Sequence, residues 1–407
     1  MQKIIGIKYL VFIIVLFFVG GIITAFEQAK FFENEMLITI NEINDFSNKG
    51  IANFLDIGSE DLVIKTSSMK NYDVVDTKLD LNLFGFIKIK TVDVNVSNTD
   101  LILCGETVGI YLENNGVTVV GFGGVKSANT TIYPFENSGL KVGDIITSIN
   151  NQKVSSSADI DYILDSKNFA GGEIVIEYMS NSQIHCENLM PVYDAVAGQY
   201  KLGLWIRENA SGIGTLTYVT QNNKFGALGH GITESGQNSP MSVSGGSLHQ
   251  CEVLGITKGK RGSAGEIRAM FRSGTEDEGI VEKNNEYGVF GTVKNNSIFK
   301  NGEKLEIGGR LTAKPGKAYI YCQLDGNEIK KYEIEIIKTN YQSKSNQKSM
   351  VLRVTDKALL EKTGGIIQGM SGSPIVQNGK IVGAVTHVFI NDPTKGFGIY
   401  LDWMLNQ

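Results

Sequence analysis

The longest run of apolar positions lies at the N-terminus, where Tyr9 to Phe26 contains no charged residue and follows Lys3 and Lys8. At about 1.5 Å per residue this run nearly spans a hydrocarbon core of roughly 30 Å. We therefore predict a transmembrane anchor within residues 1–26, with a cytoplasmic N-terminus because lysines favour that side. The alternative is a cleaved signal peptide, since Ile23-Thr24-Ala25 resembles a cleavage site. Both interpretations predict that the remaining chain is exported.

Beyond this segment, apolar positions alternate with polar ones over short stretches, which is the pattern of half-buried β-strands. Residues 27–100 end in such a run, including Ile87, Ile89 and Val92, and are predicted to form a connector with short strands. Residues 196–407 hold many short apolar or alternating runs separated by Gly, Asn, Asp and Lys turns. That pattern is typical of an all-β barrel or sandwich. The fold is therefore predicted to be mainly β.

Residues 101–195 follow a distinct order of two strands, a Gly-Leu-x-x-Gly-Asp turn, a third strand, a polar helix and a final strand. The third strand carries Ile145 and Ile146, and the helix in SADIDYILDS places Ile160 and Ile163 at helical spacing. This order resembles an α+β PDZ domain of the bacterial type.

The PDZ resemblance implies a groove in which a peptide adds as a strand and places its side chains against the helix at 159–165. The predicted peptide-binding residues are Val108, Gly109, Ile110, Tyr111 and Leu112. The alternative is a groove that the chain itself occupies.

Composition agrees with globular domains, because 42% of the residues are hydrophobic and 20% are charged. A net charge of −5, without a cluster of Lys or Arg between aromatics, argues against a nucleic-acid partner. The four cysteines lie far apart, with no CxxC pair and no histidine spaced for zinc, and are interpreted as scattered structural thiols. HExxH and the phosphate-binding GxxxxGK[ST] motif are absent, so no metal and no cofactor are predicted.

The segment GMSGSP contains the candidate nucleophile, Ser371. It resembles the GxSGxP turn of chymotrypsin-like peptidases, and the following IVQNGKIVGAVTHV is predicted to form a hairpin behind it. Small residues let the backbone bend, so that the amides of Gly369 and Ser371 can form an oxyanion hole. Ser373 is the weaker candidate because it occupies the second-glycine position of that motif. About 210 residues suit a chymotrypsin-like double β-barrel over 196–407.

A serine nucleophile needs a base, and the chain has four histidines. His185 lies beside Cys186 and is expected at the surface, and His249 lies in an expected Gly/Ser-rich turn. His387 follows the nucleophile hairpin, where it can line a pocket or pack in the core. His230 in GALGHGI is the best candidate, because an apolar strand that ends in glycines can present an imidazole at a rim.

The soluble portion as a whole resembles the stage IV sporulation protein B family, signalling peptidases of spore-forming bacteria. The resemblance rests on LFGFIKIKTVDVNV, LGLWIRENASGIGTLTY, KFGALGHGITE and GGIIQGMSGSPIVQNGKIVGAVTHVFINDPTKGFGIY. It implies catalytic roles for His230 and Ser371, and for an aspartate shortly before the serine motif, here Asp356. An orienting carboxylate hydrogen-bonds the imidazole Nδ1. The alternative is that Asp356 caps the helix predicted over DKALLEKTGG.

The resemblance further implies a sporulation role in the forespore intermembrane space. There the peptidase trims itself and cleaves the regulatory partner of a membrane metalloprotease. Two other functions stay open from the residues alone: a non-catalytic PDZ scaffold, and a general envelope quality-control protease. The second has its PDZ domain after the protease domain, whereas here the predicted order is the reverse.

Overall fold

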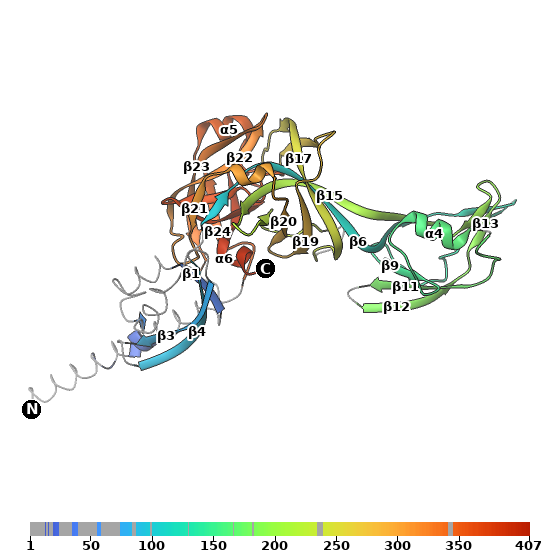
Figure 1. Cartoon of the computed structure of the whole chain (residues 1–407), viewed down its shortest axis with the longest axis horizontal. Helices are drawn as coiled ribbons and strands as arrows, with labels where there is room; N and C mark the ends of the chain where they lie inside the picture. Colours follow the sequence, from blue (N-terminus) through green and yellow to red (C-terminus); the bar gives the residue numbers. More distant parts are fainter. Residues whose placement is uncertain are drawn as a thin grey trace, which may run out of the picture.

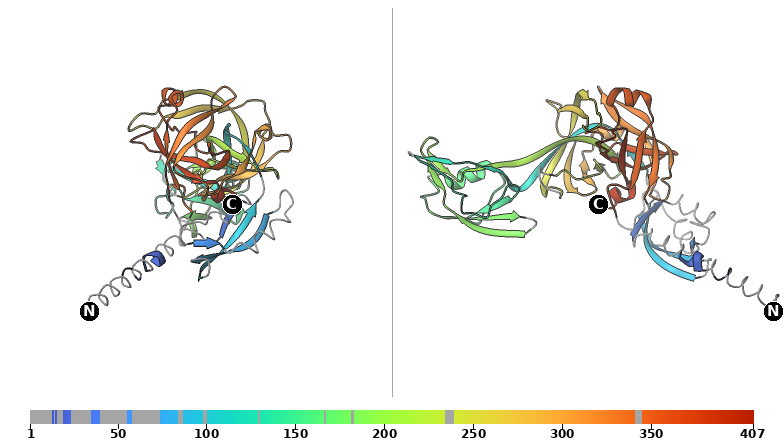
Figure 2. Two further views of the ribbon diagram at one scale, coloured as in Figure 1. Left: turned by 90° about the vertical axis from the view of Figure 1, so that its left-hand side faces the viewer. Right: turned by 180° about the vertical axis from the view of Figure 1, so that it is seen from behind.

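The computed structural model describes residues 100–407 except 129, 166, 181–182, 234–238 and 341–344, together with residues 13, 15, 19–23, 35–39, 55–57, 74–83 and 87–97. Two β-barrels pack side by side, and a smaller domain lies away from them at the end of two long strands, β6 and β15 (Figures 1 and 2).

Six of the described strands close the first barrel through antiparallel pairs, in the order β6, β15, β16, β20, β19 and β17, with β17 returning to β6. Their bounds are β6 Thr107–Phe122, β15 Leu204–Val219, β16 Lys224–Ala227, β17 Val243–Thr257, β19 Gly279–Asn285 and β20 Gly288–Val293. Strand β18 (Glu266–Phe271) extends β17 as a hairpin, and β5 (Leu101–Leu103) pairs with β15. The interior is apolar and includes Val108, Ile110 and Leu248.

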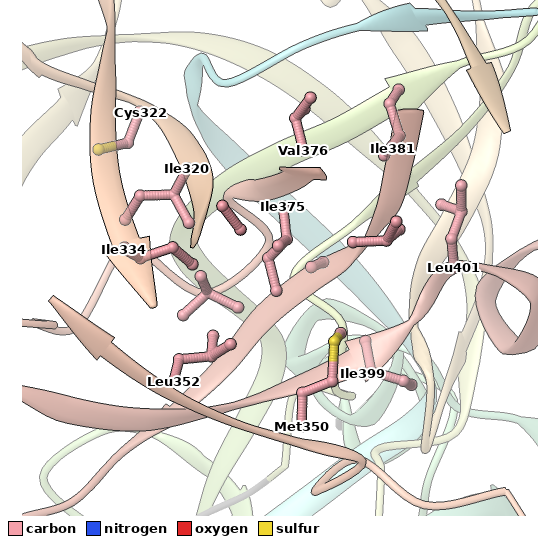
Figure 3. Packing of buried hydrophobic residues seen from close by; sticks show 14 of the residues in the cluster. Ile320, Cys322, Ile334, Met350, Leu352, Ile375, Val376, Ile381, Ile399 and Leu401 are labelled. Atoms are coloured by element: carbon pink, nitrogen blue, oxygen red, sulfur yellow. The ribbon is translucent and has the colours of Figure 1, made fainter. Parts of the chain in front are cut away.

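A second ring of six described strands closes in the order β22, β23, β24, β27, β26 and β25. Their bounds are β22 Gly316–Asp325, β23 Glu328–Thr339, β24 Met350–Val354, β25 Pro374–Gln377, β26 Lys380–Val388 and β27 Lys395–Tyr400. Figure 3 shows its core, where side chains such as Ile320, Leu352 and Ile375 fill the interior. The remaining elements are β21 (Lys304–Ile307), η1 (Ile298–Asn301), α5 (Lys357–Thr363) and α6 (Leu401–Leu405). The predicted double barrel is thus present.

The outer domain has the predicted PDZ order. Its sheet joins the second half of β6 to β9 (Ile145–Ile149), β11 (Ile174–Ser180) and β12 (Gln183–Leu189), with β10 (Gln152–Lys153) beside β9. Two small hairpins complete it: β7 (Val125–Ser127) with β8 (Thr130–Ile132), and β13 (Val192–Asp194) with β14 (Gln199–Lys201).

Helix α4 (Ser157–Leu164) begins at a capping box in which Ser156 and Asp159 each accept the other's backbone N–H. It buries Ile160, Ile163 and Leu164 against the sheet, as the apolar spacing predicts.

In the connector, four strands pair in the order β1, β4, β3, β2. They are β1 Glu35–Thr39, β2 Leu55–Ile57, β3 Val74–Leu83 and β4 Ile87–Ser97, so the alternating run predicted as a strand forms β4. No helix among the described residues is long and apolar enough to cross a membrane. Most of the anchor predicted within residues 1–26 lies outside the described residues.

The structure differs from the predicted division at 195/196, because the PDZ domain is inserted into the first barrel. Strand β5 and the first half of β6 precede the PDZ domain in sequence but pair with barrel strands. The two strands expected at the start of the PDZ segment, TVGIYL and GVTVVGF in the sequence, are also one continuous β6. The turn-like ENNG segment is absorbed into the strand, where buried Asn114 donates to Thr118 Oγ1 over 2.7 Å.

Candidate active site

The predicted nucleophile turn lies in the second barrel, between α5 and β25. Gly369 and Gly372 have φ values of 94° and 95°, a region that L-residues with a side chain rarely adopt. A Cβ at Gly372 would lie 2.0 Å from Thr215 O, and one at Gly369 would lie 2.9 Å from the Ile267 Cβ. Both glycines are therefore required by conformation and by space.

The backbone amides of Gly369 and Ser371 donate no hydrogen bond within the part of the chain that the structure describes. Their directions are nevertheless fixed. The C=O and N–H of one peptide unit point in opposite directions, and Gln368 O accepts from Ile267 N–H over 2.8 Å. On the other side of the turn, Met370 O accepts from Ser373 N–H over 2.9 Å. An oxyanion hole needs oriented donors of this kind, and here two that have no partner among the described residues flank the serine hydroxyl.

The Ser371 hydroxyl donates to the backbone oxygen of Thr386 on β26 over 2.6 Å. A hydroxyl has one proton to donate, so Ser371 does not donate to an imidazole in this arrangement. The hydroxyl must leave Thr386 O before a base can take its proton.

His230 follows β16, where Leu228 and Gly229 turn the chain with positive φ values of 67° and 68°. Its Nδ1 lies 2.9 Å from Gly231 O. A carbonyl oxygen only accepts, so Nδ1 carries the proton and Nε2 keeps the free lone pair that a general base needs. Burial lowers the pKa of His230 below its usual value of 6.5, which keeps the ring neutral at pH 7.

The His387 ring lies 5.0 Å from that of His230, at an interplanar angle of 36°. Its pKa is lowered to about 4, first by burial and then by the charges of His230 and Lys348. Because His387 directly follows Thr386, whose oxygen holds Ser371, one segment of β26 borders both candidate residues. Ser371 and His230 therefore each lie beside the Thr386–His387 segment of β26.

The comparisons with known proteins bear directly on this serine site. The model of the SpoIVB peptidase S55 family matches residues 198–405, just over half of the chain. The chain belongs to the SpoIVB peptidase S55 family. It is therefore a serine peptidase, which acts on protein substrates, and the non-catalytic scaffold is the poorer description. A PDZ domain model matches residues 95–185 of this S55 peptidase.

Two solved structures are similar to parts of the chain. The PDZ domain of the SdrC-like protein from Listeria monocytogenes is 23% identical over 23% of this chain and 87% of that one, with a TM-score of 0.18. The active form of the Rv3671c protease from M. tuberculosis is 13% identical over 49% of this chain and 73% of that one, with a TM-score of 0.28. Neither likeness is close enough to carry an argument about function. A search of curated proteins gave no match.

The other two histidines of the S55 peptidase lie elsewhere. His185 is exposed on β12 and stacks on Tyr178 at 5.5 Å, as expected for a surface residue. His249 was predicted in a turn but lies within strand β17, where its Nε2 is 2.7 Å from Ser247 Oγ. All four cysteines are free, and Cys104, Cys251 and Cys322 are buried.

The predicted triad role of Asp356 does not match its position. Its Oδ1 accepts from Leu359 N–H over 3.0 Å and its Oδ2 from Glu333 N–H over 3.3 Å. Asp356 is thus the N-cap of α5, and His230 Nδ1 bonds Gly231 O instead of a carboxylate. The capping alternative is the one that the structure supports, because helix α5 needs an acceptor for its first N–H groups.

Replacing Asp356 by serine, which keeps an N-cap oxygen but removes the carboxylate, is expected to lower casein hydrolysis by less than about tenfold. Removal of a triad aspartate costs about 10⁴-fold. Asp356→Ala is the matched variant without a cap, and we expect it to lose about 1 kcal/mol of stability in thermal unfolding. A loss of 10³-fold or more in folded Asp356→Ser would contradict the capping role.

The predicted peptide-binding residues Val108, Gly109, Ile110, Tyr111 and Leu112 are not available for strand addition. They lie in the barrel half of β6, which pairs with β15 along one edge and with β17 along the other. A peptide adds only to a strand edge with unpaired backbone groups. The sequence missed this because alternation does not reveal which strands become neighbours.

A free edge exists instead at the start of β15. Among the described strands, the segment Leu204–Ile206 pairs only with β6, and its other edge faces α4. A cavity of about 360 Å³ lies between them, lined by residues that include Ile160 and Leu164 of the helix. Ser157 N–H donates to Glu208 Oε1 over 2.6 Å, which ties the start of α4 to β15. Trp205 stands at this edge with 65% of its surface exposed.

Proposed function

We propose that the protein is an exported endopeptidase in which Ser371 is the nucleophile and His230 its general base. Ser371 Oγ attacks the peptide carbonyl carbon while its proton passes to His230 Nε2. The carbonyl π electrons move to oxygen, and the N–H groups of Gly369 and Ser371 stabilise the oxyanion. When the oxyanion collapses, the C–N bond breaks and His230 returns its proton to the leaving amine.

Deacylation repeats the sequence with water. His230 Nε2 takes a proton from water, whose oxygen bonds to the acyl carbon, and the acyl–Ser371 bond breaks as the proton returns to Ser371 Oγ. The Gly231 carbonyl, which accepts from His230 Nδ1, keeps the imidazole in the tautomer that both steps need.

The observation that carries this proposal is the pair of oriented amides beside the Ser371 hydroxyl, which donate to no group in the described part of the chain. These N–H groups favour catalysis because they are oriented before the reaction begins. The turn then does not have to reorganise as charge develops on the carbonyl oxygen.

We further propose that this peptidase makes limited cuts, in itself and in a membrane-associated regulatory protein, within a sporulation signalling pathway. An anchor within residues 1–26 would hold it at the forespore membrane, facing the intermembrane space. The free edge at Leu204–Ile206 supports this, because a docked peptide segment raises the local concentration of one substrate. The family's name is the second support for a sporulation role.

Limited cleavage is tested by incubating the full chain in two ways and identifying the products of each incubation. Incubation alone, followed by mass spectrometry, is expected to give one or a few defined N-termini. Incubation with unfolded casein is expected to give few fragments. Casein cut at many sites would instead support an envelope quality-control protease.

A further inference from the structure

Two buried threonines of β15 contact the nucleophile turn from the opposite barrel. Thr215 Oγ1 donates to Gly369 O over 2.7 Å, and Thr215 N–H donates to Ser371 O over 2.9 Å. Thr217 Oγ1 donates to Gly372 O over 2.8 Å. Both threonines are fully buried. Three of the four carbonyl groups from Gly369 to Gly372, all except that of Met370, are therefore held by one strand of the first barrel.

The peptide unit between Gly369 and Met370 is the one that separates the two candidate oxyanion donors. The torsion angles on either side of this peptide unit link the N–H groups of Gly369 and Ser371, so holding it adds to the anchoring that Gln368 O and Met370 O already give those groups. Within the described residues, Gly369 O accepts from no donor other than the Thr215 hydroxyl. Glycine gives this peptide unit little resistance to rotation, since no Cβ restricts it.

We propose that Thr215 is a positioning residue for the peptidase reaction, which sets the oxyanion donors by holding the Gly369–Met370 peptide unit from across the barrel interface. This inference rests on the proposed roles of Ser371 and Gly369. Thr215 touches neither substrate nor the reacting atoms. Its hydroxyl acts by holding the turn. The rest of its side chain packs as in any buried strand residue.

The test replaces Thr215 by valine, which keeps the β-branched shape and removes only the hydroxyl. Thr107→Val is the matched control. Thr107 pairs directly with Thr215 on β6, is 2% exposed, and donates its hydroxyl to Gln323 O over 3.0 Å, away from the turn. We expect both variants to lose a similar amount of thermal stability, since each leaves one buried carbonyl without its donor.

Only Thr215→Val is expected to react more slowly. Its rate of labelling by a fluorophosphonate, whose phosphonyl oxygen occupies the oxyanion hole, should fall about 10- to 100-fold. For casein hydrolysis, kcat should fall by a similar factor with KM unchanged, because the donors act in the transition state. Thr215→Ser, which restores the hydroxyl, should recover most of the rate.

Equal labelling rates for Thr215→Val and Thr107→Val would overturn the inference. If Thr215→Val does not fold, the pair Thr215→Ala and Thr215→Ser replaces it, and equal rates in that pair would overturn the inference in the same way. Failure of the wild-type chain to label at all would refute the proposed function instead, so the two failures are distinguishable.

Discussion

Replacing Ser371 by alanine is expected to lower kcat/KM for casein hydrolysis by about 10⁴- to 10⁶-fold, because the attacking oxygen is lost. Among the described residues the hydroxyl makes one hydrogen bond, to Thr386 O, at a partly buried site, so the variant should unfold within a few degrees of the wild type. Casein hydrolysis and a thermal unfolding curve on the same preparation measure both quantities.

Ser373→Ala is the matched control for Ser371→Ala, since both serines lie in one turn. Ser373 is fully buried, and its hydroxyl cannot meet a substrate. We expect this variant to keep its activity to within about threefold, as for an ordinary small buried change. Loss of activity in Ser373→Ala together with an active Ser371→Ala would transfer the nucleophile role to Ser373.

Replacing His230 by alanine is expected to lower kcat by a factor similar to that of Ser371→Ala, because the two residues act as a unit. The pH profile of the wild type adds a second readout. Burial lowers the pKa of His230 below 6.5, so the neutral base persists to lower pH. The acid limb of kcat/KM should therefore lie below pH 6.5 and should be absent from the residual activity of His230→Ala.

His249→Ala is the matched control for His230→Ala. His249 lies on strand β17, where its side chain is hydrogen-bonded to Ser247 and, within the described part of the chain, to no residue of the nucleophile turn. The variant should retain the wild-type profile. An acid limb well above pH 6.5 in the wild type would contradict the assignment, since it would require a base whose pKa is raised, whereas burial lowers that of His230.

Local sequence predicted the parts of the site that depend on local geometry. The glycines around Ser371 specify the turn through their positive φ values, and the glycine before His230 does the same at the end of β16. Alternation likewise predicted the strands of both barrels. These signals are strong because a conformation with φ > 0 leaves few choices of residue.

What sequence could not predict are contacts between distant segments. Nothing near Thr215 or Thr386 signals that one would hold the nucleophile turn and the other the serine hydroxyl, because these bonds join residues 154 and 15 positions apart. The insertion of the PDZ domain was hidden for the same reason. Asp356 illustrates the same difference within one residue. Its capping role could be predicted from the helix that follows it, whereas a role in a triad depended on contact with a distant histidine.

The central claim is that Ser371 is a nucleophile activated by His230, and one measurement tests it most directly. The full chain is treated with a fluorophosphonate at pH 7.5, and the modified residue and its rate of modification are determined by mass spectrometry, in parallel with His230→Ala. The account predicts a single adduct on Ser371 that forms at least about 10³-fold more slowly in His230→Ala. The absence of an adduct on Ser371, or an equal rate in the two proteins, would contradict it.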